Sequence, residues 1–217
     1  MAQRFFISKN SNECQELIER FPDIQFTCES LISFNALEFD LEREIDVLFL
    51  SSPRSVLFFH NSHSIKTVKS IACVGTKTAE VLRAMDLSPD FVVEQNAEVE
   101  RGVESFHEWL GGRHATFSLS SRSLRSYSKG LPESQKQEVE SYETVLNPKQ
   151  IAPHDCYIFT SPSNVGSFYE LNQLPESSKV IAWGSSTEKA LKVHGVHSIE
   201  VLANSSIDEL LKLLAKK

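Results

Sequence analysis

Four short segments rich in hydroxyl side chains each follow an apolar stretch and precede an amphipathic one. They are Ser-Ser-Pro-Arg-Ser at 51–55, Gly-Thr-Lys-Thr at 75–78, Thr-Ser-Pro-Ser-Asn at 160–164 and Gly-Ser-Ser-Thr at 184–187. The start of a helix leaves backbone amides without partners, and such amides bind anions. The segments could therefore hold several carboxylates or phosphates. The same residue types also serve as ordinary turn and cap residues that bind no ligand.

Two cations stand out within these segments. Arg54 and Lys77 fall in the first turn of an expected helix, where the helix dipole disfavours positive charge. Two cations at positions that the helix dipole disfavours indicate a functional role, although two solvated surface cations would fit the same pattern. The candidate binding residues are Ser51, Ser52, Arg54, Ser55, Thr76, Lys77, Thr78, Thr160, Ser161, Ser163, Asn164, Ser185, Ser186 and Thr187.

The segments repeat in one register. SSPRSVLFF at 51–59 is similar to TSPSNVGSF at 160–168, and Ser161 lies 109 positions after Ser52. VGTKTAEVL at 74–82 is similar to WGSSTEKAL at 183–191, and Gly184 again lies 109 positions after Gly75. Turn and cap chemistry explains the residue types but not the shared spacing. The chain therefore contains two similar halves.

Short apolar stretches alternate with amphipathic ones along the whole chain. This alternation predicts an α/β fold with parallel sheets, here two similar flavodoxin-like lobes joined by a two-strand linker. Strands are expected at 4–8, 24–28, 46–50, 70–74, 91–93, 115–119, 156–160, 179–183 and 197–202. Helices are expected near 12–21, 54–63, 77–86, 99–110, 164–174, 187–194 and 206–216.

The two lobes are not expected to be consecutive segments, because the last 70 or so residues carry too few strands for a complete sheet. We predict one discontinuous lobe from 1–30 and 145–217, with 37–138 inserted as the other. The linker strands are then 31–36 and 139–144. In open parallel sheets, ligands bind beyond the carboxyl ends of the strands, so the four hydroxyl-rich segments are expected to face one cleft.

Composition narrows the classes of function. The 217 residues carry a net charge of −7, which argues against general nucleic-acid binding. No apolar stretch is long enough to cross a bilayer, and the first ten residues have no signal-peptide core, so a cytoplasmic protein is expected. The four cysteines fit no zinc spacing, the paired histidines lack further ligands, and no Walker loop, dinucleotide fingerprint or serine-hydrolase elbow occurs.

Several motifs together resemble one known family. VLFLSSPRSV, IACVGTKTAEVL, YETV, YIFTSPSNV and VIAWGSSTEKAL, in this order, are similar to the uroporphyrinogen-III synthase family over residues 45–200. The chain departs from the family pattern at Lys9, where Arg is frequent, at Ser51, where Thr is frequent, and at Trp183, which replaces a small aliphatic residue. Each motif alone is weak, and the ordered set is more specific.

The resemblance implies a lyase that needs no metal or cofactor. Its substrate would be hydroxymethylbilane, a linear tetrapyrrole with many carboxylates, which loses water and closes to uroporphyrinogen III with ring D inverted. Spontaneous closure leaves ring D uninverted, so the enzyme must fold the chain for the inverting attack, which is catalysis by proximity. Tyr142 matches the family's tyrosine in the crossing between lobes and is the candidate catalytic residue, as a proton donor to the departing hydroxyl. We further expect a monomer that binds neither nucleic acid nor membrane.

One alternative function stays open. A hinged two-lobed protein that binds a small polyanion without catalysis would use the same loops. Tyr142 separates the two hypotheses, because a binding protein has no need of a phenol at the junction of the lobes. An ordinary tyrosine that packs by its ring on a linker strand would also fit this position.

Overall fold

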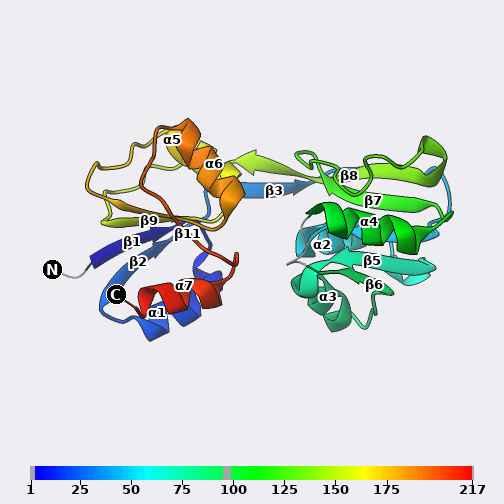
Figure 1. The fold of residues 1–217 in the computed structure, drawn as a ribbon, viewed down its shortest axis with the longest axis horizontal. Helices are drawn as coiled ribbons and strands as arrows, with labels where there is room; N and C mark the ends of the chain where they lie inside the picture. Colours follow the sequence, from blue (N-terminus) through cyan, green and yellow to red (C-terminus); the bar gives the residue numbers. More distant parts are fainter. Residues whose placement is uncertain (1–2, 95–98, 217) are drawn as a thin grey trace. The chain divides into compact units, whose positions relative to one another are not determined.

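The computed structural model describes residues 3–94 and 99–216, which form two compact units (Figure 1). Unit 1 consists of 1–33 and 145–217, and unit 2 consists of 34–144. Each unit is a sheet of mostly parallel strands with helices on both faces. The α/β fold class predicted from the alternation of apolar and amphipathic stretches is confirmed.

The sheet of unit 1 has the strand order β11-β10-β9-β1-β2. Its neighbouring strands pair in parallel, for example Phe5 with Phe26 and Phe6 with Tyr157. The strands are β1 (Gln3–Ile7), β2 (Ile24–Cys28), β9 (Cys156–Phe159), β10 (Lys179–Ala182) and β11 (Glu200–Val201). The helices are α1 (Gln15–Arg20), α5 (Pro162–Tyr169), α6 (Ser185–Val193) and α7 (Ile207–Leu214), with a 3-10 turn η1 (Ser11–Glu13).

Alternate side chains of these strands enter two separate cores, as parallel strands covered on both faces require. Phe5 and Ile158 pack against Leu17 of α1 and Leu210 of α7 on one face. Phe6 and Phe159 pack against α5 and α6 on the other. In Figure 1, α1 and α7 accordingly lie on one side of this sheet and α5 and α6 on the other.

The sheet of unit 2 has the order β3-β8-β7-β4-β5-β6. The strands are β3 (Ile32–Ala36), β4 (Val47–Leu50), β5 (Ser70–Val74), β6 (Phe91–Val93), β7 (Ala115–Ser120) and β8 (Lys136–Leu146). The helices are α2 (Pro53–Ser62), α3 (Gly75–Ala84) and α4 (Val99–Leu110), with 3-10 turns η2 (Ile65–Thr67) and η3 (Glu133–Gln135). Leu48 and Cys73 pack under α2 and α3, and Phe49 and Phe117 pack under α4.

The two sheets share one topology when unit 1 is read from β9. The series β9, β10, β11, β1, β2 then occupies the same positions as β4, β5, β6, β7, β8. In both sheets the order of the strands reverses beside the first strand of the series, between β9 and β1 in unit 1 and between β4 and β7 in unit 2. Such a reversal is the place where open parallel sheets bind ligands.

Some element boundaries differ from those expected from the sequence. Helix α5 begins at Pro162 rather than near 164, because the fixed φ of proline suits the first turn of a helix. The strand expected at 197–202 is reduced to Glu200–Val201, which pair only with the last two residues of β10. Strand β8 is longer than the linker expected at 139–144, because its first half pairs with β7 as part of the sheet of unit 2.

Candidate active site

The four hydroxyl-rich segments follow β4, β5, β9 and β10 and open α2, α3, α5 and α6. Within each unit, two of them therefore lie side by side at the carboxyl edge of the sheet, as parallel strands require. Ser52 and Ser161 are the matching N-cap residues, with the same φ of −162°. The hydroxyl of Ser52 accepts from the Ser55 amide at 3.2 Å, and that of Ser161 accepts from the Asn164 amide at 3.2 Å.

The second helix of each unit begins differently. Neither the N-cap residue of α3 nor that of α6 makes a side-chain cap, and no side chain in 3–94 or 99–216 accepts a hydrogen bond from the amides of either first turn. Gly75 opens α3 with a φ of +76°, a conformation that favours glycine. Uncapped first-turn amides at matching positions in two units leave donors available for anions.

Exposure separates the candidate binding residues into three groups. Arg54, Thr76, Lys77, Ser185 and Ser186 are exposed. Ser51, Ser52, Thr160, Ser161 and Ser163 are half-buried. Ser55, Thr78, Asn164 and Thr187 are buried and point into the units that carry them. The Asn164 amide oxygen, for example, accepts from the backbone of Leu31 at 2.8 Å. The same positions are buried in both units, so the repeat extends to the orientation of the side chains.

The two predicted cations lie on neighbouring helices of unit 2. The guanidinium of Arg54 lies 4.0 Å from the centroid of the Phe34 ring, while Lys77 is exposed in the first turn of α3. Among the residues that the structure describes, no carboxylate forms an ion pair with either cation. No described carboxylate therefore occupies their donors, which can meet an anionic ligand.

Tyr142 lies on β8, immediately beside the loop that opens α2. The register of β7 and β8 shifts between Leu119 and Ser120, so that Ser120 pairs with Tyr142. The phenol is 7% exposed and its oxygen lies 3.3 Å from the Ser52 hydroxyl. Its ring stacks on Phe58 at 5.0 Å and meets the edge of Phe34 at 6.1 Å. The structure thus brings Tyr142 together with Ser52 and, through Phe34, with Arg54.

Sequence reasoning missed both phenylalanines. Phe58 lies one helical turn after Arg54, but its i+4 spacing is typical of any amphipathic helix. Phe34 belongs to a strand expected only as a linker and is 20 positions away from Arg54 in the chain. No local pattern connects them, since their contact depends on how β3 and β8 are placed beside α2.

In unit 1, the equivalent edge is built around Ser8 and Thr160. The Thr160 amide donates to the Ser8 hydroxyl at 2.8 Å, and the Thr160 hydroxyl donates to the Ser8 carbonyl at 2.7 Å. The next residue, Lys9, lies 5.7 Å from the Trp183 ring and pairs with Glu13 at 2.7 Å. Ser8 and Lys9 were not among the predicted binding residues, because only the repeated segments were considered.

Two cysteines lie under this edge. The Cys14 thiol and the Cys28 sulfur form a hydrogen bond that raises the pKa of Cys14 and lowers that of Cys28. The Ser11 hydroxyl donates to the Cys28 carbonyl at 3.3 Å and the Cys14 amide donates to the Ser11 carbonyl, which fixes the two residues beside each other. Burial raises the pKa of Cys73, in unit 2, to about 11, so that thiol stays protonated at neutral pH.

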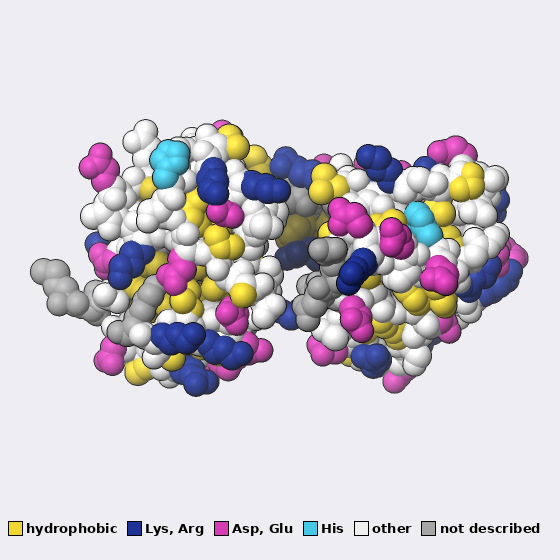
Figure 2. Space-filling model, viewed as in Figure 1, with side chains coloured by type: hydrophobic (Ala, Val, Ile, Leu, Met, Phe, Trp, Pro, Cys, Tyr) yellow, Lys and Arg dark blue, Asp and Glu magenta, His cyan; other side chains and the backbone are white. Residues whose placement is uncertain are grey.

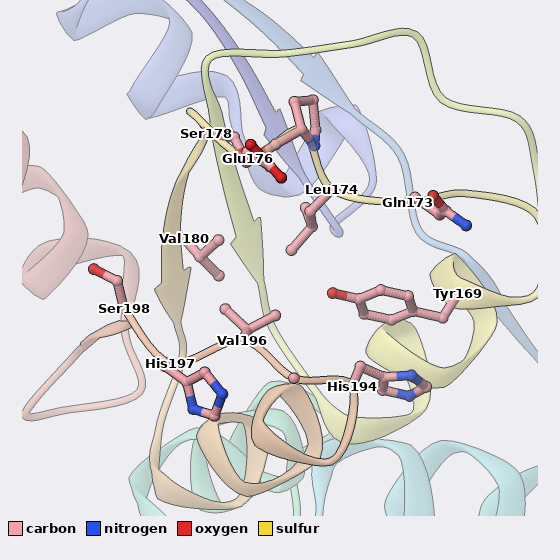
Figure 3. A pocket seen from close by; sticks show the side chains of 12 residues that line it. Tyr169, Gln173, Leu174, Glu176, Ser178, Val180, His194, Val196, His197 and Ser198 are labelled. Carbon is pink, nitrogen blue, oxygen red and sulfur yellow. The ribbon is translucent and has the colours of Figure 1, made fainter.

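A separate pocket of about 510 Å³ lies in unit 1 (Figure 3). Tyr169 and His194 line it as a parallel pair with ring centroids 4.0 Å apart, and Tyr169 directs its hydroxyl into the pocket. The pocket is formed by the segments that precede β10 and β11, at the amino ends of these strands. The hydroxyl-rich segments follow their strands, at the carboxyl ends. The pocket is therefore not part of the repeated site.

Charge is distributed without one dominant sign on the face shown in Figure 2, where acidic and basic side chains are interspersed. An anionic ligand would therefore depend on local groups such as Arg54, Lys77 and the helix amides. Within 3–94 and 99–216, no group of three or more histidine, cysteine or acidic side chains is arranged to hold a metal ion. In the same ranges no helix has the length and apolar character required to cross a bilayer.

Known proteins provide three comparisons. A family model described as uroporphyrinogen-III synthase HemD matches residues 15–212. The fold is similar to uroporphyrinogen-III synthetase from Helicobacter pylori, with a TM-score of 0.74 and 16% identity over 99% of each chain. It is also similar to a mutant uroporphyrinogen III synthase from Thermus thermophilus, with a TM-score of 0.60 and 14% identity over 99% of this chain and 98% of that one. No curated protein matches the chain in sequence.

Proposed function

This chain belongs to the uroporphyrinogen-III synthase family, and we propose that its loops bind the substrate while Tyr142 donates a proton to the departing hydroxyl. The enzyme is a lyase of tetrapyrrole biosynthesis that cyclises hydroxymethylbilane. Two tasks follow from that reaction. The substrate's carboxylates must be held so that ring D can invert, and the terminal hydroxyl must leave.

The loops of both units carry out the first task. The exposed residues Arg54, Thr76, Lys77, Ser185 and Ser186 contact substrate carboxylates directly, together with the uncapped amides of α3 and α6. The half-buried residues Ser51, Ser52, Thr160, Ser161 and Ser163 line the same edges. The buried residues Ser55, Thr78, Asn164 and Thr187 act indirectly, since their hydrogen bonds and packing fix the loops.

Tyr142 carries out the second task, and its hydrogen bond to Ser52 supports this role. The Ser52 hydroxyl oxygen already accepts the Ser55 amide, so its own hydrogen is free to point toward the Tyr142 oxygen. In that arrangement Ser52 donates and Tyr142 keeps its phenolic hydrogen for the substrate. The phenol passes this proton to the departing hydroxyl, which leaves as water. The phenol oxygen later recovers a proton from the ring D carbon that forms the closing C–C bond and gives up its hydrogen. The contact between Ser52 and Tyr142 is the observation that carries the proposal.

Substitution of Tyr142 by Phe tests this assignment. General acid catalysis typically contributes about 10²–10⁴-fold, but the substrate also loses water spontaneously, so kcat should fall by roughly 10-fold or more. KM and the melting temperature should change little, because Phe58 and Phe34 still pack on the ring. The remaining product should stay mainly the inverted isomer, since the loops fold the substrate.

The matched control is Tyr157→Phe, which removes another buried phenol. Tyr157 lies in unit 1, where its oxygen accepts from the His154 amide at 3.0 Å. This variant should keep its kcat and lose some stability. Full activity of Tyr142→Phe would refute the acid role and leave water or substrate carboxylates to assist departure.

We further propose that the enzyme acts as a monomer in the cytoplasm. Each unit has cores of its own, and the large apolar side chains that remain exposed, such as Leu57, Leu124 and Val193, belong to separate elements. Light scattering on the purified chain should give the mass of one copy, 24.4 kDa. A mass of two copies at micromolar concentration would contradict this.

A further inference from the structure

Four side chains from three elements of unit 2 form a continuous chain of contacts. The Arg54 guanidinium lies over the Phe34 ring at 4.0 Å, the edge of Phe34 meets Tyr142 at 6.1 Å, and Tyr142 stacks on Phe58 at 5.0 Å with an interplanar angle of 16°. Arg54 and Phe58 come from α2, Tyr142 from β8 and Phe34 from β3. Phe34 is the one member that contacts both the cation and the phenol.

The group that holds the Arg54 side chain in place determines how well its guanidinium can bind a ligand. An exposed arginine has many rotamers and loses their entropy when it binds a ligand. A carboxylate partner would fix the side chain but would also occupy the guanidinium donors. An aromatic ring fixes the cation from its face while leaving the N–H groups at the edge free. No described carboxylate pairs with Arg54, so Phe34 is its principal support within unit 2.

We propose that Phe34 is a positioning residue that preorganises Arg54 to receive a carboxylate of the substrate. This rests on the proposed function, in which Arg54 contacts such a carboxylate directly. The ring holds the guanidinium at the start of α2, one residue before Ser55 and two after Ser52. A substrate carboxylate then meets a cation that is already in place, beside the phenol that acts on the departing hydroxyl.

The test is a series of ring substitutions at Phe34. Phe34→Leu keeps an apolar side chain but removes the π face, and Phe34→Trp keeps a face that binds cations more strongly. A surface cation–π contact corresponds to a factor of about 2–5 in an equilibrium constant, so Phe34→Leu should raise KM by about that factor. Phe34→Trp should return KM to within about 2-fold of the parent chain. Pentafluorophenylalanine at position 34 keeps the shape but reverses the charge distribution of the ring, and it should raise KM as Leu does.

The background of Arg54→Ala separates positioning from packing. In that background Phe34→Leu should have no further effect on KM, because the cation that it supports is gone. A purely structural role would instead lower the melting temperature and kcat of every Phe34→Leu chain, with or without Arg54. The pentafluorophenylalanine protein answers the question even where Phe34→Leu fails to fold.

The outcomes distinguish this inference from the function on which it rests. If Arg54→Ala raises KM while the Leu, Trp and pentafluorophenylalanine proteins share one KM, Phe34 does not position the cation and the inference is overturned. If Arg54→Ala leaves KM unchanged, the contact between Arg54 and the substrate is refuted, and the inference falls with it. If KM depends on the ring at position 34 in the parent chain but not in the Arg54→Ala background, both the inference and the proposed role of Arg54 are supported.

Discussion

At the scale of single residues, Arg54 and Lys77 place positive charge at the starts of two neighbouring helices, where no carboxylate of the described part of the chain pairs with either. Each opposes the dipole of its own helix, so neither is expected to stabilise the fold. Substitution of both by Ala should therefore weaken substrate binding by ~1–3 kcal/mol, the range for hydrogen bonds between charged groups, without lowering the melting temperature. Initial rates measured over a range of substrate concentrations give the KM.

The matched control is Lys66→Ala, which removes an exposed cation of unit 2 from the 3-10 turn before β5, at the other edge of the sheet. Its KM should equal that of the parent chain. An unchanged KM in the double variant would show that Arg54 and Lys77 are ordinary solvated cations.

Part of the candidate site could be predicted from the sequence and part could not. Hydroxyl residues at strand ends and the shared register of Ser52 with Ser161 indicated which loops to consider. The sequence did not reveal that Thr78 and Thr187 turn inward, because orientation depends on where the helix begins, and α3 begins earlier than expected. The contact of Phe34 with Arg54 was also missed, since it joins a strand and a helix that no local pattern relates.

At the scale of elements, substitution by alanine at two helical glycines should change the stability of the protein in opposite directions. Glycine costs roughly 0.5–1 kcal/mol relative to alanine within a helix. At Gly166 of α5 no atom lies within 4 Å of an added methyl group, so Gly166→Ala should stabilise the protein by about that amount. At Gly102 of α4 the methyl group would lie 2.8 Å from Val93 Cγ1 and 2.9 Å from the Tyr127 hydroxyl. Gly102→Ala should therefore destabilise the protein by about 1–3 kcal/mol, the usual cost of overpacking.

Chemical denaturation of the two alanine variants would measure both effects. Since the helix contribution has the same sign at the two sites, the difference between the two free-energy changes measures the close packing of α4 against Val93 and Tyr127. Equal and stabilising changes at both positions would show that a methyl group at position 102 fits beside Val93 and Tyr127, contrary to the distances above.

Element positions were largely predictable because the physical signals are strong. Apolar stretches such as Val47–Leu50 and Cys156–Phe159 are buried throughout, as strands of a sheet covered on both faces must be. The ends were less predictable, because they depend on partners. β11 is short since only two residues of β10 pair with it, and β8 is long since it continues past a shift of register beside β7.

At the scale of the whole molecule, the chain enters unit 1, builds unit 2 from one continuous segment, and returns to unit 1. All strands of the sheet from β4 to β8 lie in 34–146, whereas the sheet of unit 1 needs β1 and β2 from the start of the chain and β9, β10 and β11 from its end. The fragment 32–146 should therefore fold alone, and the fragment 147–217 should not, because it lacks β1, which pairs with β9, and β2, which pairs with β1.

Circular dichroism and thermal melting of both fragments test this expectation. The fragment 32–146 should melt cooperatively, and 147–217 should do so only after a peptide of 1–31 is added. A cooperative transition of 147–217 alone would mean that β9, β10 and β11 form a stable sheet without β1 and β2.

The isomer of the product decides whether the chain directs ring closure of hydroxymethylbilane. The substrate is generated in situ, because it closes spontaneously, and the products are separated by chromatography after oxidation to porphyrins. With the protein present, the inverted isomer, uroporphyrinogen III, should dominate, and without it the uninverted isomer should form. The Tyr142→Phe variant should form the inverted isomer more slowly. Uninverted product at the spontaneous rate in the presence of the folded parent chain would show that the chain does not direct ring closure.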